Sequence, residues 1–173
     1  YLAEDLTFSE TTTIGAINWW GFYDLDNPPA VETFRIRFYS SRAGDGLPGD
    51  VLWEQSLSNA ARTATGRHVL LGVSPLEYFY EWTMPAPFVA LAETTYWLEI
   101  SQIADITSGF RWEDGFSGNR RYAGLNYAIF SDWRISAEMI DRSLQLVAIP
   151  EPAAITLALL AAAWSRRSIS LMK

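Results

Sequence analysis

The side chains that could carry out catalysis are few and scattered in this sequence. It contains one histidine, His68, and no cysteine, which excludes thiol catalysis, disulfides and cysteine-ligated zinc. No Gly-x-Ser-x-Gly segment marks a serine nucleophile. One histidine also cannot supply the two or three ligands of a typical metalloenzyme. These absences predict that the chain is not an enzyme.

Three carboxylates keep one catalytic class open. Glu113, Asp114 and Asp132 lie in a stretch rich in loop-forming residues, where two carboxyl groups could flank a glycosidic bond as in glycoside hydrolases. The chain has 20 acidic residues, so an acidic cluster arises easily by chance. Glycoside hydrolysis therefore ranks as a remote alternative.

Aromatic and polar side chains favour a binding function over a catalytic one. Sugar rings stack on Trp and Tyr, while Asn and Arg hydrogen-bond to sugar hydroxyls. Trp19 and Trp20 are adjacent in an expected strand, so they point to opposite faces and only one can lie in the core. The alternative is that the aromatic side chains pack beneath loops and onto a sheet. The candidate glycan-binding residues are Trp19, Trp112, Asn119, Arg121 and Tyr122.

Two acidic loops offer oxygen ligands of the kind that calcium prefers. Asp24, Asp26 and Asn27 precede two prolines, and Asp45 and Asp50 flank a glycine-rich turn. Neither loop has EF-hand spacing, and Asp and Asn are also common turn formers. We therefore expect no cofactor, with Ca²⁺ bound by the first loop as the alternative.

The elements that must position these residues are β-strands. Residues 34–39 alternate between apolar and polar side chains, as a strand with one buried face requires. No long helical periodicity precedes residue 153. Short strands without intervening helices predict an all-β antiparallel sandwich. Further expected strands, rich in aromatic and β-branched residues, are residues 6–8, 14–22, 51–55, 76–84, 94–100, 110–112 and 143–147.

The composition indicates one packed domain. The chain has 173 residues, of which 49% are hydrophobic and 14% aromatic, and this length suits one domain core rather than two. The net charge is -7. Because an acidic chain lacks the basic surface that neutralises phosphates, we expect no nucleic-acid partner.

The C-terminal residues have the order of a membrane-directed signal. A charge-free, mostly apolar run at residues 153–164 would form a helix of about 18 Å, against roughly 30 Å for a hydrocarbon core. Spanning would therefore need local thinning of the bilayer and snorkelling of the paired arginines, which mark the cytoplasmic side. The alternative is a C-terminal helix that is buried or interfacial. The flanking residues are Pro150, Glu151 and Pro152 before the run and Arg166 and Arg167 after it.

This tail resembles the C-terminal sorting signal of PEP-CTERM proteins. In that family an exosortase-type enzyme processes an exported, membrane-tethered protein near the Pro-Glu-Pro triplet. The resemblance implies a β-sandwich ectodomain at residues 1–147 and a sorting and anchor segment at residues 148–173, with a membrane-spanning helix. The chain departs from the family in its mixed Ser-Ile-Ser-Leu-Met-Lys end. Because it starts at Tyr1, we expect a signal peptide upstream.

A second resemblance concerns the body of the chain. Residues 14–21, 34–39, 46–49 and 94–98 are similar to the jelly-roll-type sandwich modules of exported bacterial proteins that carry this tail. The resemblance implies a jelly-roll-like fold and a surface location, with no catalytic residues. We therefore expect a secreted structural or adhesive component of the cell surface or extracellular matrix that contacts polysaccharide. The alternative is a carbohydrate-binding module with a dedicated glycan site.

Overall fold

The protein is all-β in the part of the chain that can be described. The computed structural model describes residues 1–24, 28–70, 73–103, 109–115, 122–124, 132–135 and 141–150. These residues contain no helix, and their strands pair antiparallel throughout. The expected C-terminal helix lies outside the described residues.

Six strands form the first sheet, called sheet A. They are β1 (Leu2–Thr7), β3 (Thr33–Ser41), β4 (Pro48–Ser58), β7 (Thr95–Gln102), β10 (Tyr122–Gly124) and β11 (Arg134–Ile135). Their order across the sheet is β11-β10-β1-β7-β3-β4. Sheet A therefore ends at β4 on one side.

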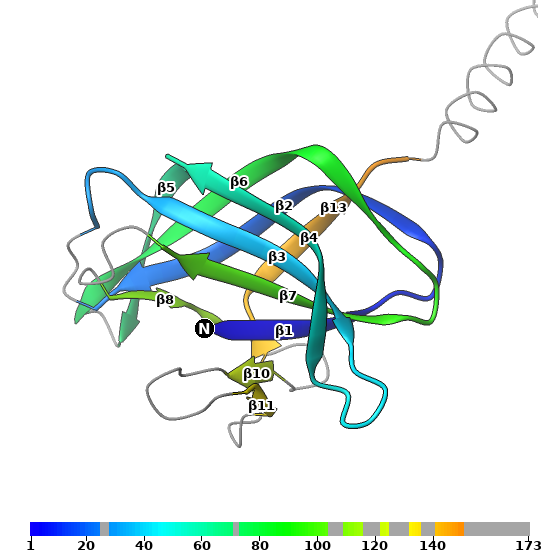
Figure 1. The fold of residues 1–173 in the computed structure, drawn as a ribbon. Helices are drawn as coiled ribbons and strands as arrows, with labels where there is room; N and C mark the ends of the chain where they lie inside the picture. Colours follow the sequence, from blue (N-terminus) through cyan, green and yellow to red (C-terminus); the bar gives the residue numbers. More distant parts are fainter. Residues whose placement is uncertain are drawn as a thin grey trace, which may run out of the picture.

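The second sheet, called sheet B, lies across from sheet A in a sandwich-like arrangement (Figure 1). Its strands are β2 (Thr12–Tyr23), β5 (Ala61–Leu70), β6 (Val73–Ala90), β13 (Leu144–Ala148) and β8 (Phe110–Trp112). The order is β13-β2-β6-β5, and β8 pairs with β2. A separate two-stranded ladder joins β9 (Asp114–Gly115) to β12 (Asp141–Arg142).

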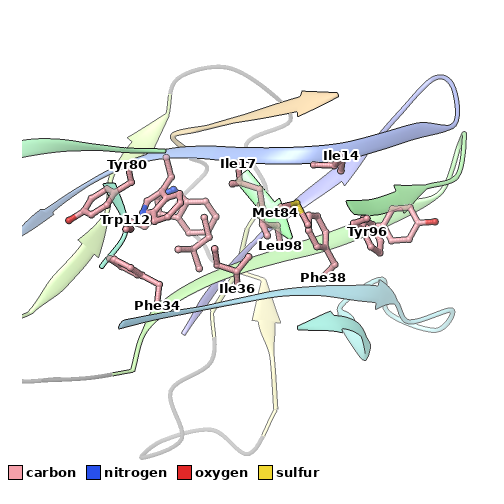
Figure 2. Close-up of a cluster of buried hydrophobic side chains, with 14 of the residues drawn as sticks. Ile14, Ile17, Phe34, Ile36, Phe38, Tyr80, Met84, Tyr96, Leu98 and Trp112 are labelled. Atoms are coloured by element: carbon pink, nitrogen blue, oxygen red, sulfur yellow. The ribbon is translucent and has the colours of Figure 1, made fainter. Parts of the chain in front are cut away.

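The core consists of aromatic and aliphatic side chains from the facing surfaces of the two sheets (Figure 2). Trp19 of β2 stacks on Tyr80 of β6 with ring centroids 5.1 Å apart, and its indole meets Phe34 of β3 edge-on at 5.4 Å. Phe38 of β3 stacks on Phe88 of β6 at 4.2 Å. Burying one large apolar side chain stabilises the fold by about 1.5–3 kcal/mol, so the contacts of Trp19 with Phe34 and of Phe38 with Phe88 hold the sheets face to face.

The alternation expected for residues 34–39 is confirmed. Phe34, Ile36 and Phe38 are fully buried, whereas Arg35 and Arg37 lie on the opposite face. Each of the other expected segments overlaps a strand. Strand β5 was not expected, because its residues 61–68 are all exposed and show no apolar alternation.

The outer face of sheet A is also partly covered. On β7, Leu98 faces the main core, while Trp97 and Glu99 point away from it and are nevertheless 0% and 1% exposed. A second apolar cluster explains the burial of Trp97, because it packs there with the residues Ala3, Tyr39, Ala123 and Trp133. The central strand β7 is therefore buried on both faces.

Gly21 of β2 occupies a position with no room for a side chain. A Cβ there would lie 2.5 Å from the Phe110 ring and 2.7 Å from the backbone oxygen of Arg111, because β8 pairs with β2 at this residue. We expect Gly21→Ala to lower the free energy of unfolding by about 1–3 kcal/mol, the usual cost of overpacking, as measured by urea denaturation. Gly44→Ala is the matched control, since no atom lies within 4 Å of its Cβ position. Equal losses in the two variants would contradict the assignment.

Candidate functional site

The structure buries the aromatic residues expected to bind glycan. Trp19, Trp112 and Tyr122 are 0%, 3% and 5% exposed, so none offers a ring face to a ligand. This corrects the expectation of an exposed stacking platform at these three residues. Asn119 and Arg121 lie outside the described residues.

Interior contacts explain the burial of two of these rings. The indole N–H of Trp112 donates a hydrogen bond to the backbone oxygen of Ser143 at 2.9 Å. The Arg142 guanidinium lies over the Tyr122 ring, 4.1 Å from the ring centroid. The backbone N–H of Arg142 donates a hydrogen bond to the Glu4 carboxylate at 3.0 Å. These residues join β8, β10 and β12 to β1, which is a structural role.

Trp20, the neighbour of Trp19, is the outward-facing indole of this pair. It is half-buried on the outer face of sheet B and packs against Phe79, with ring centroids 4.8 Å apart. The expectation that the two tryptophans point to opposite faces is confirmed, with Trp19 in the core.

The described part of the first candidate calcium loop contains one acidic residue. Asp24 is exposed and accepts a hydrogen bond from the Arg111 guanidinium, whereas Asp26 and Asn27 lie outside the described residues. In the second loop, Asp45 pairs with Arg42 at 3.0 Å. Among the described residues, no group of three or more His, Cys, Asp or Glu side chains is placed to hold a metal ion.

The three carboxylates considered for glycoside hydrolysis have different partners. Asp114 pairs with Arg142, and Asp132 pairs with Arg42 at 2.8 Å. Glu113 faces Glu77 instead. Of the three, only Glu113 has another carboxyl group, that of Glu77, as its neighbour in place of a close arginine.

Glu77 and Glu113 form the most unusual cluster of ionisable groups in the described structure, here called the carboxyl pair. One guanidinium lies against both: Arg67 Nη1 is 3.3 Å from Glu77 Oε2, and Arg67 Nη2 is 3.9 Å from Glu113 Oε1. The side chains of Glu77 and Glu113 are 2% and 13% exposed. Two acidic groups therefore share one cation in a nearly closed environment.

Three strands bring the carboxyl pair together. Glu77 comes from β6, Arg67 from β5, and Glu113 directly follows β8. The backbone of Glu113 is held on both sides, since its N–H donates to Trp20 at 3.0 Å and its carbonyl accepts from Ser143 at 2.9 Å. The position of Glu113 is therefore set by the backbone of sheet B.

The two members of the pair differ in acidity. Burial raises the pKa of Glu113 to about 8, and its hydrogen bond to Glu77 and the charge of Glu77 act in the same direction. Burial opposes ionisation of Glu77 as well, but hydrogen bonds from Glu113 and Thr65 and the charge of Arg67 hold its pKa below the ordinary value. With a pKa of about 8, Glu113 is mostly protonated at neutral pH, beside the ionised Glu77.

This arrangement can hold and release one proton. Glycoside hydrolases place their two carboxyl groups about 5–10 Å apart, with the substrate between them. The two carboxyl groups instead share the Arg67 guanidinium and are 2% and 13% exposed, which leaves no open cleft between them for a sugar. Its geometry fits a buried acid that links β5, β6 and the end of β8.

Three buried carboxylates, Glu77, Glu32 and Glu99, carry no signal in the sequence that marks them as buried. The Glu32 carboxylate accepts hydrogen bonds from Tyr23 and, at 2.9 Å, from Tyr80. Glu99 accepts from Ser101 at 2.6 Å. Glutamates at such strand and loop positions usually face solvent, so the residue type does not reveal that these three are buried.

His68 and the tail triplet are placed only in part. His68 is exposed on β5, and Pro150 is exposed two residues beyond β13. Glu151, Pro152, Arg166 and Arg167 lie outside the described residues. Within the described part, no helix of sufficient length and apolar character to cross a membrane is found.

The comparison with known families identifies the domain. Residues 1–145 match the family described as Domain of unknown function (DUF7901). The chain belongs to this family. No curated protein and no solved structure matches it. The matched region extends from β1 into β13, so the DUF7901 domain includes both sheets, and with them the three sheet B strands that hold the carboxyl pair.

The carboxyl pair predicts how stability of the DUF7901 domain depends on pH. Because the folded-state pKa of Glu113 is raised, its contribution is complete in acid and is lost as pH rises from about 4.5 to about 8. The slope is at most about 1.4 kcal/mol per pH unit for one proton. We expect Glu113→Gln, which stays neutral and can still donate to Glu77, to remove this slope. Denaturant unfolding across that pH range measures it.

Glu10→Gln serves as the control, because Glu10 is exposed. The contribution of Glu77 runs the other way, since its lowered pKa stabilises the fold above its unfolded-state value and is lost in stronger acid. A slope that persists in Glu113→Gln, or disappears in Glu10→Gln, would show that the carboxyl pair does not control this pH range.

Proposed function

We propose that this DUF7901 protein is an exported structural or adhesive component of the cell surface or extracellular matrix, delivered through a PEP-CTERM-type sorting signal. In this proposal the tail tethers the protein to the inner membrane, and an exosortase-type enzyme is its processing partner. The domain is assigned no catalytic activity. The observation that carries the proposal is how the chain leaves sheet B.

The sheet ends directly before the triplet. Strand β13 pairs with β2, and the Ile149 N–H extends this pairing by donating to the Thr13 carbonyl at 2.8 Å. The Ile149 side chain also packs directly against Gly15, which leaves no room there for a Cβ. The next residue, Pro150, is exposed. The triplet thus follows a firmly paired strand and starts at the protein surface. This position supports the proposal that a processing enzyme can reach it.

The connectivity supports a jelly-roll-like sandwich for the ectodomain. The chain places β1 in sheet A, β2 in sheet B, β3 and β4 in sheet A, β5 and β6 in sheet B, and β7 in sheet A. Such repeated crossing between two antiparallel sheets is typical of jelly rolls and Greek keys. The proposed ectodomain is residues 1–147, and the proposed sorting and anchor segment is residues 148–173.

Removing the triplet tests the sorting proposal. We expect a variant with Pro150→Ala, Glu151→Ala and Pro152→Ala to accumulate at the inner membrane with its tail attached, because the processing enzyme no longer finds its site. Cell fractionation and the mass of the C-terminal peptide measure this outcome. Pro85→Ala with Pro87→Ala is the control, since these prolines are also exposed and separated by one residue. Cytosolic protein, or normal processing of the triplet variant, would contradict the proposal.

Contact with polysaccharide is a second candidate function, favoured by the position of Trp20. Its indole lies on the outer face of sheet B, half-buried against Phe79, where a sugar ring can stack on the remaining face. This contact would supply adhesion to a matrix glycan.

The outward indole can be tested directly. We expect Trp20→Ala to weaken polysaccharide binding by about threefold to tenfold, since one stacked ring contributes about 0.5–1.5 kcal/mol, and Trp20→Phe to keep most of it. Tryptophan fluorescence titration against a polysaccharide panel measures binding. Silence across the panel, or wild-type binding by Trp20→Ala, would remove this candidate.

A further inference from the structure

The free edges of the two sheets lie next to each other in the chain. Among the described residues, β4 has a strand neighbour only in β3, and β5 has one only in β6. Just Asn59 and Ala60 connect β4 to β5, with Asn59 in the left-handed region at φ 56° and its N–H donating to Glu32 at 2.8 Å. This tight link places both free edges on one lateral side of the sandwich (Figure 1).

The core is incompletely covered along this side. Trp53 and Leu57 of β4 and Trp82 of β6 pack against the main core but are only partly buried. The Trp53 and Trp82 rings lie 5.9 Å apart. A strand added beside this edge would cover the partly exposed side chains of Trp53, Leu57 and Trp82.

Both edges are regular where they approach the link. Residues 53–58 of β4 pair with β3 without a register shift, and residues 61–64 of β5 pair in the same way with β6. The bulges of both strands lie further from the link. Neither regular segment contains the Pro or Lys residues that commonly block edge-to-edge pairing. Within the part of the chain that the structure describes, both edges are thus unpaired and open to a further strand.

The charges of the two edges are complementary. Strand β4 carries Asp50 and Glu54 and no basic residue, whereas β5 carries Arg62, Arg67 and His68 and no acidic residue. The Glu54 and Arg67 side chains have ion-pair partners within their own sheets, yet they are 44% and 73% exposed. Pairing of β4 with β5 brings opposite charges together, while pairing of β4 with β4 would oppose like charges.

We propose that two copies of this DUF7901 domain pair through these edges, with β4 of each copy adding to β5 of the other. Because the link reverses the chain direction between β4 and β5, a two-fold axis parallel to the strands brings β4 beside its partner's β5 in antiparallel orientation. The same rotation forms the second ladder, so the contact is self-complementary and closes as a dimer. The inference goes beyond the proposed surface function and does not depend on it.

A charge exchange tests the pairing in the full chain. We expect sedimentation velocity to show a concentration-dependent dimer for the unsubstituted protein. Glu54→Arg alone and Arg67→Glu alone should each weaken self-association by about tenfold, because each places like charges together in both ladders. An equimolar mixture of these two variants should dimerise again, since both contacts then join opposite charges. The tail is present in every sample, so differences between variants report the edges.

Substitutions that do not involve the carboxyl pair provide a second arm. Ala64→Lys, on the β5 edge, should abolish the dimer, whereas Val147→Lys on the distant edge strand β13 should leave it intact. The chain has no cysteine, so Ser56→Cys and Thr63→Cys copies can be mixed and oxidised. A cross-linked heterodimer is expected from this mixture and not from Ser56→Cys mixed with Val147→Cys. A monomer at every concentration, or a dimer that ignores Ala64→Lys, overturns the proposal.

Discussion

The requirement that two β-sheets bury their apolar faces against each other determines most of this structure. Aromatic rings meet this requirement across the sandwich, with Trp19 between Tyr80 and Phe34 and Phe38 against Phe88. Because side chains alternate along a strand, every ring placed in the core sends its neighbour outward. The outward direction of Trp20 follows from the inward position of Trp19.

Buried carboxylates are the second theme, and each is compensated in a different way. Glu32 is held by two tyrosine hydroxyls and lies 2.8 Å from Arg62. Glu99 is held by Ser101 and Tyr39 and lies beside Arg35. Glu77 lies 3.3 Å from the Arg67 guanidinium and beside a second acid, Glu113, whose raised pKa keeps it protonated and so removes repulsion between two carboxylates. A buried charge without such partners would cost several kcal/mol.

Strands with a clear alternation could be predicted from the sequence, and those without it could not. Residues 34–39 contain three buried apolar positions and match β3, whereas β5 has only exposed residues at 61–68 and is a strand because β6 pairs with it. The candidate site was less predictable. The sequence placed Glu113 among possible catalytic acids, but its partner Glu77 lies in another strand, and the contact between them depends on how β6, β2 and β8 are ordered in sheet B.

Residue order by itself determined the all-β character and the inward set of aromatic residues on β3, because these depend on neighbours along the chain. Tertiary structure decided which outward positions are covered. Trp97 and Glu99 alternate with core residues as solvent-facing residues would, yet both are buried. The physical reason is that burial depends on what packs over a face, and strands distant in sequence supply that cover: β1 and β3 flank β7, while Trp133 packs near Tyr39 at 5.7 Å.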